Sequence, residues 1–98
     1  MTVGLRIRAE AEREFEDAAL WYEARRPGLG LQLVGELDRV LDRITESPRQ
    51  FPLVSDQCRR GLLRRFPYGV YFLLEEDVAV VIAILHMHRR PDTWRSRE

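Results

Sequence analysis

The stretch Val78-Ala79-Val80-Val81-Ile82-Ala83-Ile84-Leu85 is the longest apolar run in the sequence, and it decides the fold. A short run rich in β-branched residues is typical of a buried strand. Simple alternation puts Val80, Ile82 and Ile84 on one face, and the residues between them make a second apolar face. A strand that is apolar on both faces is usually covered on both. The run is far shorter than the ~20 residues that a membrane-spanning helix requires.

Two more strands are expected just before this run. Residues Gly61 to Phe66 form the first and Val70 to Leu74 the second. Pro67-Tyr68-Gly69 and Glu75-Glu76-Asp77 mark the two turns, so the three strands form an antiparallel meander. Residues 49–57 show no periodicity and indicate a loop. By strand parity, Arg64 and Arg65 point to opposite faces of their strand.

The first half of the chain is mainly helical. Alternation from Val3 to Arg8 predicts an opening strand, and a 3.6-residue apolar stripe predicts a helix from Ala9 to Arg25. Pro27-Gly28-Leu29-Gly30 ends that helix, and a second amphipathic helix runs to about Glu46, where Ser47-Pro48 stops it. Two helices joined by a short loop form an αα-hairpin.

The predicted order is therefore β-α-α-β-β-β. We expect one α+β domain over residues 1–98, with the helical hairpin packed on one face of a small, mainly antiparallel sheet. The hairpin covers only one face of the strand Val78–Leu85. Either the C-terminal tail, Pro91 to Arg97 with one helical turn around Trp94, covers the other face, or a partner chain does. The sequence leaves both possibilities open.

Composition limits the classes of function. The net charge is zero, so bulk charge predicts no partner, and all 16 Lys/Arg positions are arginine. Arginine presents a planar fork of donors that suits carboxylates and phosphates. The lone Cys58 allows no internal disulfide and no cysteine-based metal site, and it fits a reducing compartment. Because residues 1–8 lack a signal-peptide core, we expect a soluble, cytoplasmic protein without a membrane anchor.

Three motifs together resemble a known family. Ala18-Ala19-Leu20-Trp21-Tyr22-Glu23, followed by Arg26-Pro27-Gly28-Leu29-Gly30, resembles the helix–loop–helix start of ParE-like toxins. The segment from Arg64 to Tyr71 resembles their central hairpin, and that from Ile84 to Trp94 their last strand and tail. The chain is thus similar to the RelE/ParE superfamily of toxins from bacterial type II toxin–antitoxin systems, and nearest to its ParE-type members.

The resemblance implies a toxin neutralised by a small antitoxin encoded beside it. That partner would be ParD-like or similar, with a ribbon-helix-helix start. ParE-type members are associated with inhibition of DNA gyrase, whereas RelE-type members cleave mRNA on the ribosome. Fold alone does not choose between these activities. A third alternative is a module that binds its antitoxin and has lost toxicity.

The residues favour a binding toxin over an enzyme. Cleavage of RNA needs a base, an acid and cations for the phosphate. The resemblance implies that RNA-cleaving members draw these from basic residues of the sheet and a tyrosine or histidine near the C-terminus. His86 or His88, with Arg65 as the cation, are the candidates here. By that family pattern the set is incomplete, because no tyrosine follows Tyr71 and Trp94 stands where the tail would need an acid. Alternation places His86 on the face of Val80, as a packed residue at the end of the strand, unless a β-bulge before it reverses its side. We expect no metal and no cofactor, and contact with nucleic acid only if the protein is a ribonuclease.

Candidate contact residues follow from the same comparison. Arginine and tryptophan are favoured anchors at protein interfaces. The candidates for antitoxin binding are Leu20, Trp21, Arg64 and Arg65. The candidates for target binding are Arg89, Arg90 and Trp94, with core packing as the other interpretation of Trp94.

Overall fold

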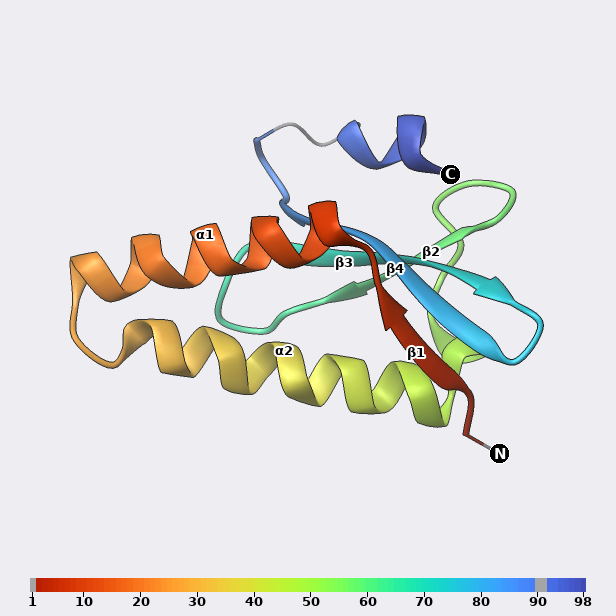
Figure 1. Ribbon diagram of the computed structural model, residues 1–98, viewed down its shortest axis with the longest axis horizontal. Coiled ribbons are helices and arrows are strands. Elements are labelled where there is room, and N and C mark those ends of the chain that lie inside the picture. Colours follow the sequence, from red (N-terminus) through yellow and green to blue (C-terminus); the bar gives the residue numbers. More distant parts are fainter. Residues whose placement is uncertain (1, 90–91) are drawn as a thin grey trace.

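The computed structural model describes residues 2–89 and 92–98, and its elements follow the predicted order (Figure 1). They are β1 (Gly4–Ile7), α1 (Ala9–Arg25), α2 (Leu29–Glu46), β2 (Cys58–Leu62), β3 (Tyr68–Glu75) and β4 (Val78–His86). Short 3₁₀ turns lie at Pro48–Gln50 and Thr93–Arg97. The α+β class, both helices and the helical turn around Trp94 are confirmed.

The four strands form one mixed sheet in the order β1-β4-β3-β2. β2, β3 and β4 form the expected antiparallel meander, and β1 joins the outer side of β4 in parallel. Figure 1 shows α1 and α2 side by side, running in opposite directions across the sheet. A Cβ added to Gly30 would lie 2.7 Å from the Ala19 carbonyl oxygen, so this glycine allows the two helices to approach closely.

Apolar side chains form a separate core on each face of the sheet. The helix-side core holds the buried stripes of α1 and α2 and the facing residues of the strands, including Ile44, Phe72 and Val81. The tail-side core includes Val80 and Leu85, and Trp94 closes it. Trp94 is only 4 % exposed, and its ring stacks on Tyr71 with centroids 5.3 Å apart. The chain's own tail therefore covers the second face of β4.

A β-bulge in β4 corrects the predicted alternation. Tyr71 pairs with Ala83 and Phe72 pairs with Val81, so Ile82 is an extra residue. Ile82 and Ala83 both contribute to the tail-side core, whereas Ile84 lies in the helix-side core. The prediction that Ile84 and His86 continue the face of Val80 is wrong, because the extra residue reverses the faces of all later positions.

The predicted bounds of β2 and β3 are also wrong. β2 begins three residues earlier than expected and ends at Leu62, and β3 begins already at Tyr68. Arg64 and Arg65 therefore lie in the connection between the strands, not on opposite faces of one strand. The Leu63 N–H donates to the Tyr68 carbonyl at 3.0 Å and closes this connection.

A partly buried ion pair holds the tail against the bulge. The Arg97 guanidinium forms a two-pronged contact with the Glu14 carboxylate, with both N–O distances 2.9 Å. Arg97 also donates to the Ile82 carbonyl at 3.0 Å, and Glu14 accepts the Ile84 N–H at 3.1 Å. The two side chains thus satisfy backbone groups that the bulge removes from the sheet, since buried polar groups need partners.

Candidate functional site

Exposed apolar residues gather on the outer surface of the helical hairpin. Leu20 and Leu31 are 70 % and 75 % exposed, and Trp21 is 43 % exposed. Gly30 packs against Ala19, and α1 and α2 run in opposite directions. Ala19 and Gly30 thus face each other across the hairpin. In two antiparallel helices the residues that directly follow a facing pair point to the same side, so Leu20 and Leu31 lie on one side of the hairpin. The exposure of Leu20 and Trp21 is confirmed, and Leu31 of α2 adds to this apolar surface, whereas its role in binding antitoxin stays a prediction.

Trp21 lies between two arginines. The Arg25 guanidinium is 4.3 Å from the Trp21 ring centroid, and the Arg89 guanidinium is 5.8 Å from it. The Tyr22 ring packs edge-on to Trp21 at 4.9 Å. We call the group Leu20, Trp21, Arg25 and Arg89 the Trp21 surface. It brings Trp21, which was predicted to bind antitoxin, next to Arg89, which was predicted to bind the target.

A hollow of about 290 Å³ separates α1 from the end of β4 beside this surface. Its lining residues are Glu14, Asp17, Ala18, Trp21, Tyr68, Ile84, Leu85, His86 and Arg89. The bulge brings His86 to this side, where its ring lies 5.3 Å from Tyr68 and 5.8 Å from His88. The His88 N–H donates to His86 Nδ1 at 3.1 Å.

The rings of Tyr68, His86 and His88 form a row, and its surroundings shift the pKa values of His86 and Tyr68. Burial lowers the pKa of His86 from 6.5, and the positive charges of Arg89 and His88 lower it further. Burial likewise raises the pKa of Tyr68 above its usual 10, with a contribution from Tyr22. His86 is therefore held neutral at neutral pH, with its Nδ1 already engaged as an acceptor.

Glu36 positions Arg64 and Arg65. Its Oε1 atom accepts the backbone N–H of Arg64 at 2.8 Å and that of Arg65 at 3.0 Å, and the carboxylate is 9 % exposed. The two arginine side chains are exposed and lie beside a hollow of about 330 Å³ that also contains Tyr68 and His88. Glu36 was not among the residues predicted from the sequence. Its spacing from Leu33 and Val40 was the available signal, because it places an acid on the buried stripe of α2.

The target candidates Arg89 and Trp94 do not lie together. Trp94 is buried on the tail side, as its packing interpretation predicted, whereas Arg89 is exposed beside Trp21. Arg90 lies outside the described residues. His86 and Arg65, the two candidates for RNA cleavage, line different hollows on either side of Tyr68.

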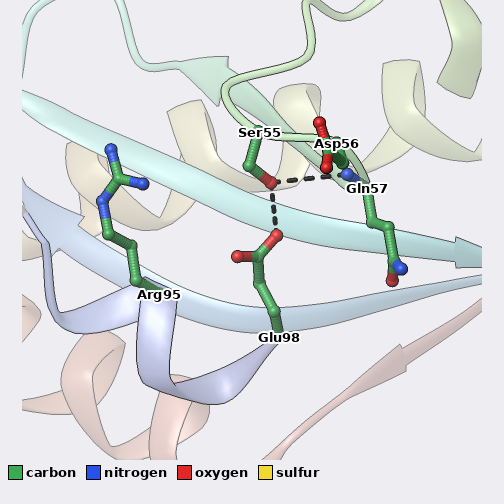
Figure 2. Close-up of a pocket in the computed structure, with 5 residues that line it drawn as sticks. All are labelled: Ser55, Asp56, Gln57, Arg95 and Glu98. Carbon is green, nitrogen blue, oxygen red and sulfur yellow. Dashed lines mark hydrogen bonds between the residues drawn. The ribbon is translucent and has the colours of Figure 1, made fainter.

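A hollow of about 500 Å³ lies between the tail and the loop before β2 (Figure 2). Ser55 spans it, since its hydroxyl donates to the Glu98 carboxylate and accepts the N–H of Cys58 at 3.1 Å. In Figure 2 the Arg95 side chain lies apart from this contact. The arrangement ties the tail to the loop.

Metal and membrane chemistry receive no support from the part of the chain that is described. Over residues 2–89 and 92–98, no three His, Cys, Asp or Glu side chains are grouped as a metal site. No helix in these ranges has the length and apolar character to cross a bilayer.

Comparison with known families agrees with the resemblance noted in the sequence. The family described as the ParE toxin of the type II toxin–antitoxin system parDE matches residues 5–91. The chain belongs to this family. No curated protein matches the sequence at a significant level.

Solved structures place this ParE-family chain in the RelE/ParE fold. A chromosomal ParDE toxin–antitoxin system from P. aeruginosa matches with a TM-score of 0.76 at 16 % identity, covering 87 % of this chain and 96 % of that one. A mutant of the E. coli toxin RelE in its free state matches with a TM-score of 0.60 at 19 % identity, covering 93 % and 90 %. The toxin–antitoxin complex RelBE2 from Mycobacterium tuberculosis matches with a TM-score of 0.59 at 14 % identity, covering 88 % and 99 %. At such identities the likeness concerns the fold alone.

Proposed function

We propose that this ParE-family chain inhibits DNA gyrase in the cytoplasm by direct contact and catalyses no reaction of its own. A ParD-like antitoxin, with a ribbon-helix-helix start, holds it inactive until it is released. Family membership supports the toxin role. The observation that carries the binding mechanism is the Trp21 surface, a half-exposed tryptophan between two arginines.

The Trp21 surface has the chemistry of a protein interface. Tryptophan and arginine dominate the residues whose removal weakens protein complexes most. A cation over an indole ring is worth about 0.5–1 kcal/mol when exposed and about 2 kcal/mol when a partner excludes water. Contact with a partner therefore strengthens interactions that the free chain already makes between Trp21 and Arg25.

Binding is favoured over RNA cleavage by the tail. Trp94 fills the tail-side face and stacks on Tyr71, which leaves that part of the sheet closed to a nucleotide. His86 and Arg65 line separate hollows, whereas an acid–base pair for phosphate transfer must meet at one reacting group.

A gyrase assay tests the proposal. The purified chain is expected to block supercoiling by gyrase or to trap cleaved DNA, and the double variant Trp21→Ala, Arg89→Ala is expected to lose this effect. Arg13→Ala, an exposed arginine near the start of α1, serves as the matched control. Unimpaired supercoiling at micromolar wild-type chain would refute gyrase as the target.

Antitoxin binding is tested with the protein encoded next to the toxin gene. It should form a stable complex with the chain and restore gyrase activity. Leu20→Ala and Trp21→Ala should weaken the complex if the antitoxin covers the hairpin surface. If production of the chain without antitoxin harms no cells and inhibits neither gyrase nor translation, the chain is a non-toxic binding module instead.

The row of Tyr68, His86 and His88 supports one second candidate, ribosome-dependent mRNA cleavage. His86 could act as a base once its Nδ1 is released from the His88 N–H, and Arg64 and Arg65 line a hollow together with Tyr68. This candidate predicts cut transcripts after induction, and none with His86→Ala. Intact transcripts with the wild-type chain would eliminate it.

A further inference from the structure

The outer edge of β2 is only partly covered by the chain. The loop before β2 pairs with its first half, since the Val54 N–H donates to the Cys58 carbonyl at 2.8 Å. The Arg60 N–H in turn donates to the Pro52 carbonyl at 3.1 Å. The loop departs at this point, and within residues 2–89 and 92–98 no element pairs with the rest of this edge.

The uncovered part of the edge is centred on Leu62. Successive residues of an antiparallel strand direct their backbone groups to opposite sides. Arg60 bonds outward to the loop, and Leu63 bonds inward to Tyr68, so the N–H and C=O of Leu62 point outward. The Leu62 side chain is also 50 % exposed. An exposed strand edge of this kind is a template for an added strand.

Arginines surround this free edge. Arg39 and Arg43 of α2, with Arg64 of the β2–β3 connection, enclose a hollow of about 110 Å³ whose apolar wall is Val40. The hollow is well below the ~300–1,000 Å³ of small-molecule sites and suits a single side chain. Glu36 also lines it, but its Oε1 atom is already engaged by two backbone N–H groups.

These arginines form no ion pair with the residues that the structure describes. Among the described residues, ion pairs join Arg6 to Glu75, Arg95 to Asp92 and Arg97 to Glu14, and none involves Arg39, Arg43 or Arg64. The exposed Asp38 and Asp42 lie on α2 next to this set without pairing with it. The lining of the hollow itself holds three guanidinium groups and one carboxylate, so a net positive charge faces a ligand that enters it.

We propose that an acidic, extended segment of the antitoxin docks here as a fifth strand outside β2. Its backbone would pair with the free groups of Leu62, one apolar side chain would enter the hollow beside Val40, and its carboxylates would contact the three arginines. This inference rests on the proposed antitoxin partner and adds a second contact, separate from the Trp21 surface. A second copy of the chain is disfavoured, because two β2 edges would bring like charges together. Nucleic acid is disfavoured because the free groups pair with a peptide backbone and the hollow is too small for a base.

Two variants separate the backbone and charge contributions. Leu62→Pro removes the outward N–H without removing a bond of the sheet, and proline is tolerated at such edge positions. It should weaken antitoxin binding up to about tenfold, the value of one hydrogen bond. The triple variant Arg39→Glu, Arg43→Glu, Arg64→Glu should weaken binding on the order of 100-fold and reduce its dependence on salt. Arg6→Glu on β1 makes one such charge reversal at the opposite edge of the sheet and should bind nearly as the wild type does.

The binding partner in this test is the purified protein from the neighbouring reading frame, and thermal unfolding verifies that each variant folds. Amide hydrogen exchange at Leu62 gives a readout that needs no variant, and it should slow in the complex. Unchanged exchange at Leu62 together with wild-type affinity of the triple variant would overturn the edge proposal while the toxin–antitoxin pair stands. Absence of any complex with the wild-type chain would instead overturn the antitoxin partner itself.

Discussion

Replacing Arg97 with alanine tests the role of the ion pair beneath the β4 bulge. The substitution removes both prongs of the contact with Glu14 and the bond to the Ile82 carbonyl. It also leaves a carboxylate of low exposure with the Ile84 N–H as its remaining partner. The tail should then lose its main polar attachment to α1.

The size of the effect follows from the burial of the pair. Breaking a fully buried ion pair costs about 3–5 kcal/mol, because an unpaired charge stays behind. Glu14 and Arg97 keep 23 % and 18 % of their side-chain exposure, so water replaces part of the lost interaction. We expect a loss of about 2–3 kcal/mol in the free energy of unfolding. For a domain of this size that lowers the melting temperature on the order of 10–20 °C.

Urea and thermal unfolding measure this loss, with Arg6→Ala as the control. Arg6 makes a longer and well-exposed contact with Glu75, at 3.7 Å, so its removal should change stability by less than about 0.5 kcal/mol. Arg97→Lys should recover only part of the loss, since lysine lacks the planar fork. Equal effects of Arg97→Ala and Arg6→Ala would refute the argument that the bulge makes this pair important.

Three further outcomes are expected. Gly30→Ala should destabilise the chain by about 1–3 kcal/mol through its clash with Ala19, whereas Gly35→Ala, whose added Cβ meets nothing, should stabilise α2 by about 0.5–1 kcal/mol; thermal unfolding of both distinguishes them, and shifts of the same sign would count against the packing argument. Because the pKa of His86 is lower in the folded chain, the unfolded chain binds more protons below pH 6.5, so stability should fall as the pH drops from 7 toward the folded pKa, and His86→Gln should flatten this slope. Burial raises the pKa of the Cys58 thiol to about 12, so iodoacetamide at pH 8 should modify it only as fast as the chain unfolds, and rapid labelling of the folded chain would contradict its burial.

Periodicity was sufficient to predict the helices and the order in which helices and strands follow one another along the chain. The stripe from Ala11 to Tyr22 has polar residues between its members, so both its period and its direction are visible in the sequence. The run from Val78 to Leu85 has no polar residue that would mark one face. Its alternation therefore carried no trace of the extra residue at Ile82, and the side of His86 could not be predicted.

The polar residues that become buried or partly buried were the harder part of the site. Glu14, Glu36 and Arg97 look like surface charges in the sequence. Folding alone brings them to their partners, which are backbone groups and, for Glu14 and Arg97, each other. The bulge supplies the Ile82 carbonyl and the Ile84 N–H, and the β2–β3 connection supplies the two amides that Glu36 accepts. The strand bounds near Arg64 were mistaken for the same reason. Trp21 needed no such context, because its exposed position follows directly from the helical period.

The parallel pairing of β1 with β4 joins the beginning of the chain to its end, with Gly4 opposite Val78 and Glu14 gripping Arg97. Contacts between such distant positions form late, since a long loop must close first. A nascent chain in which β4 and Arg97 have not yet been made lacks two partners of Glu14 in α1. It can complete neither the sheet nor the tail-side core. A cell that makes this protein would therefore face no folded toxin domain until the residues up to Arg97 have been synthesised.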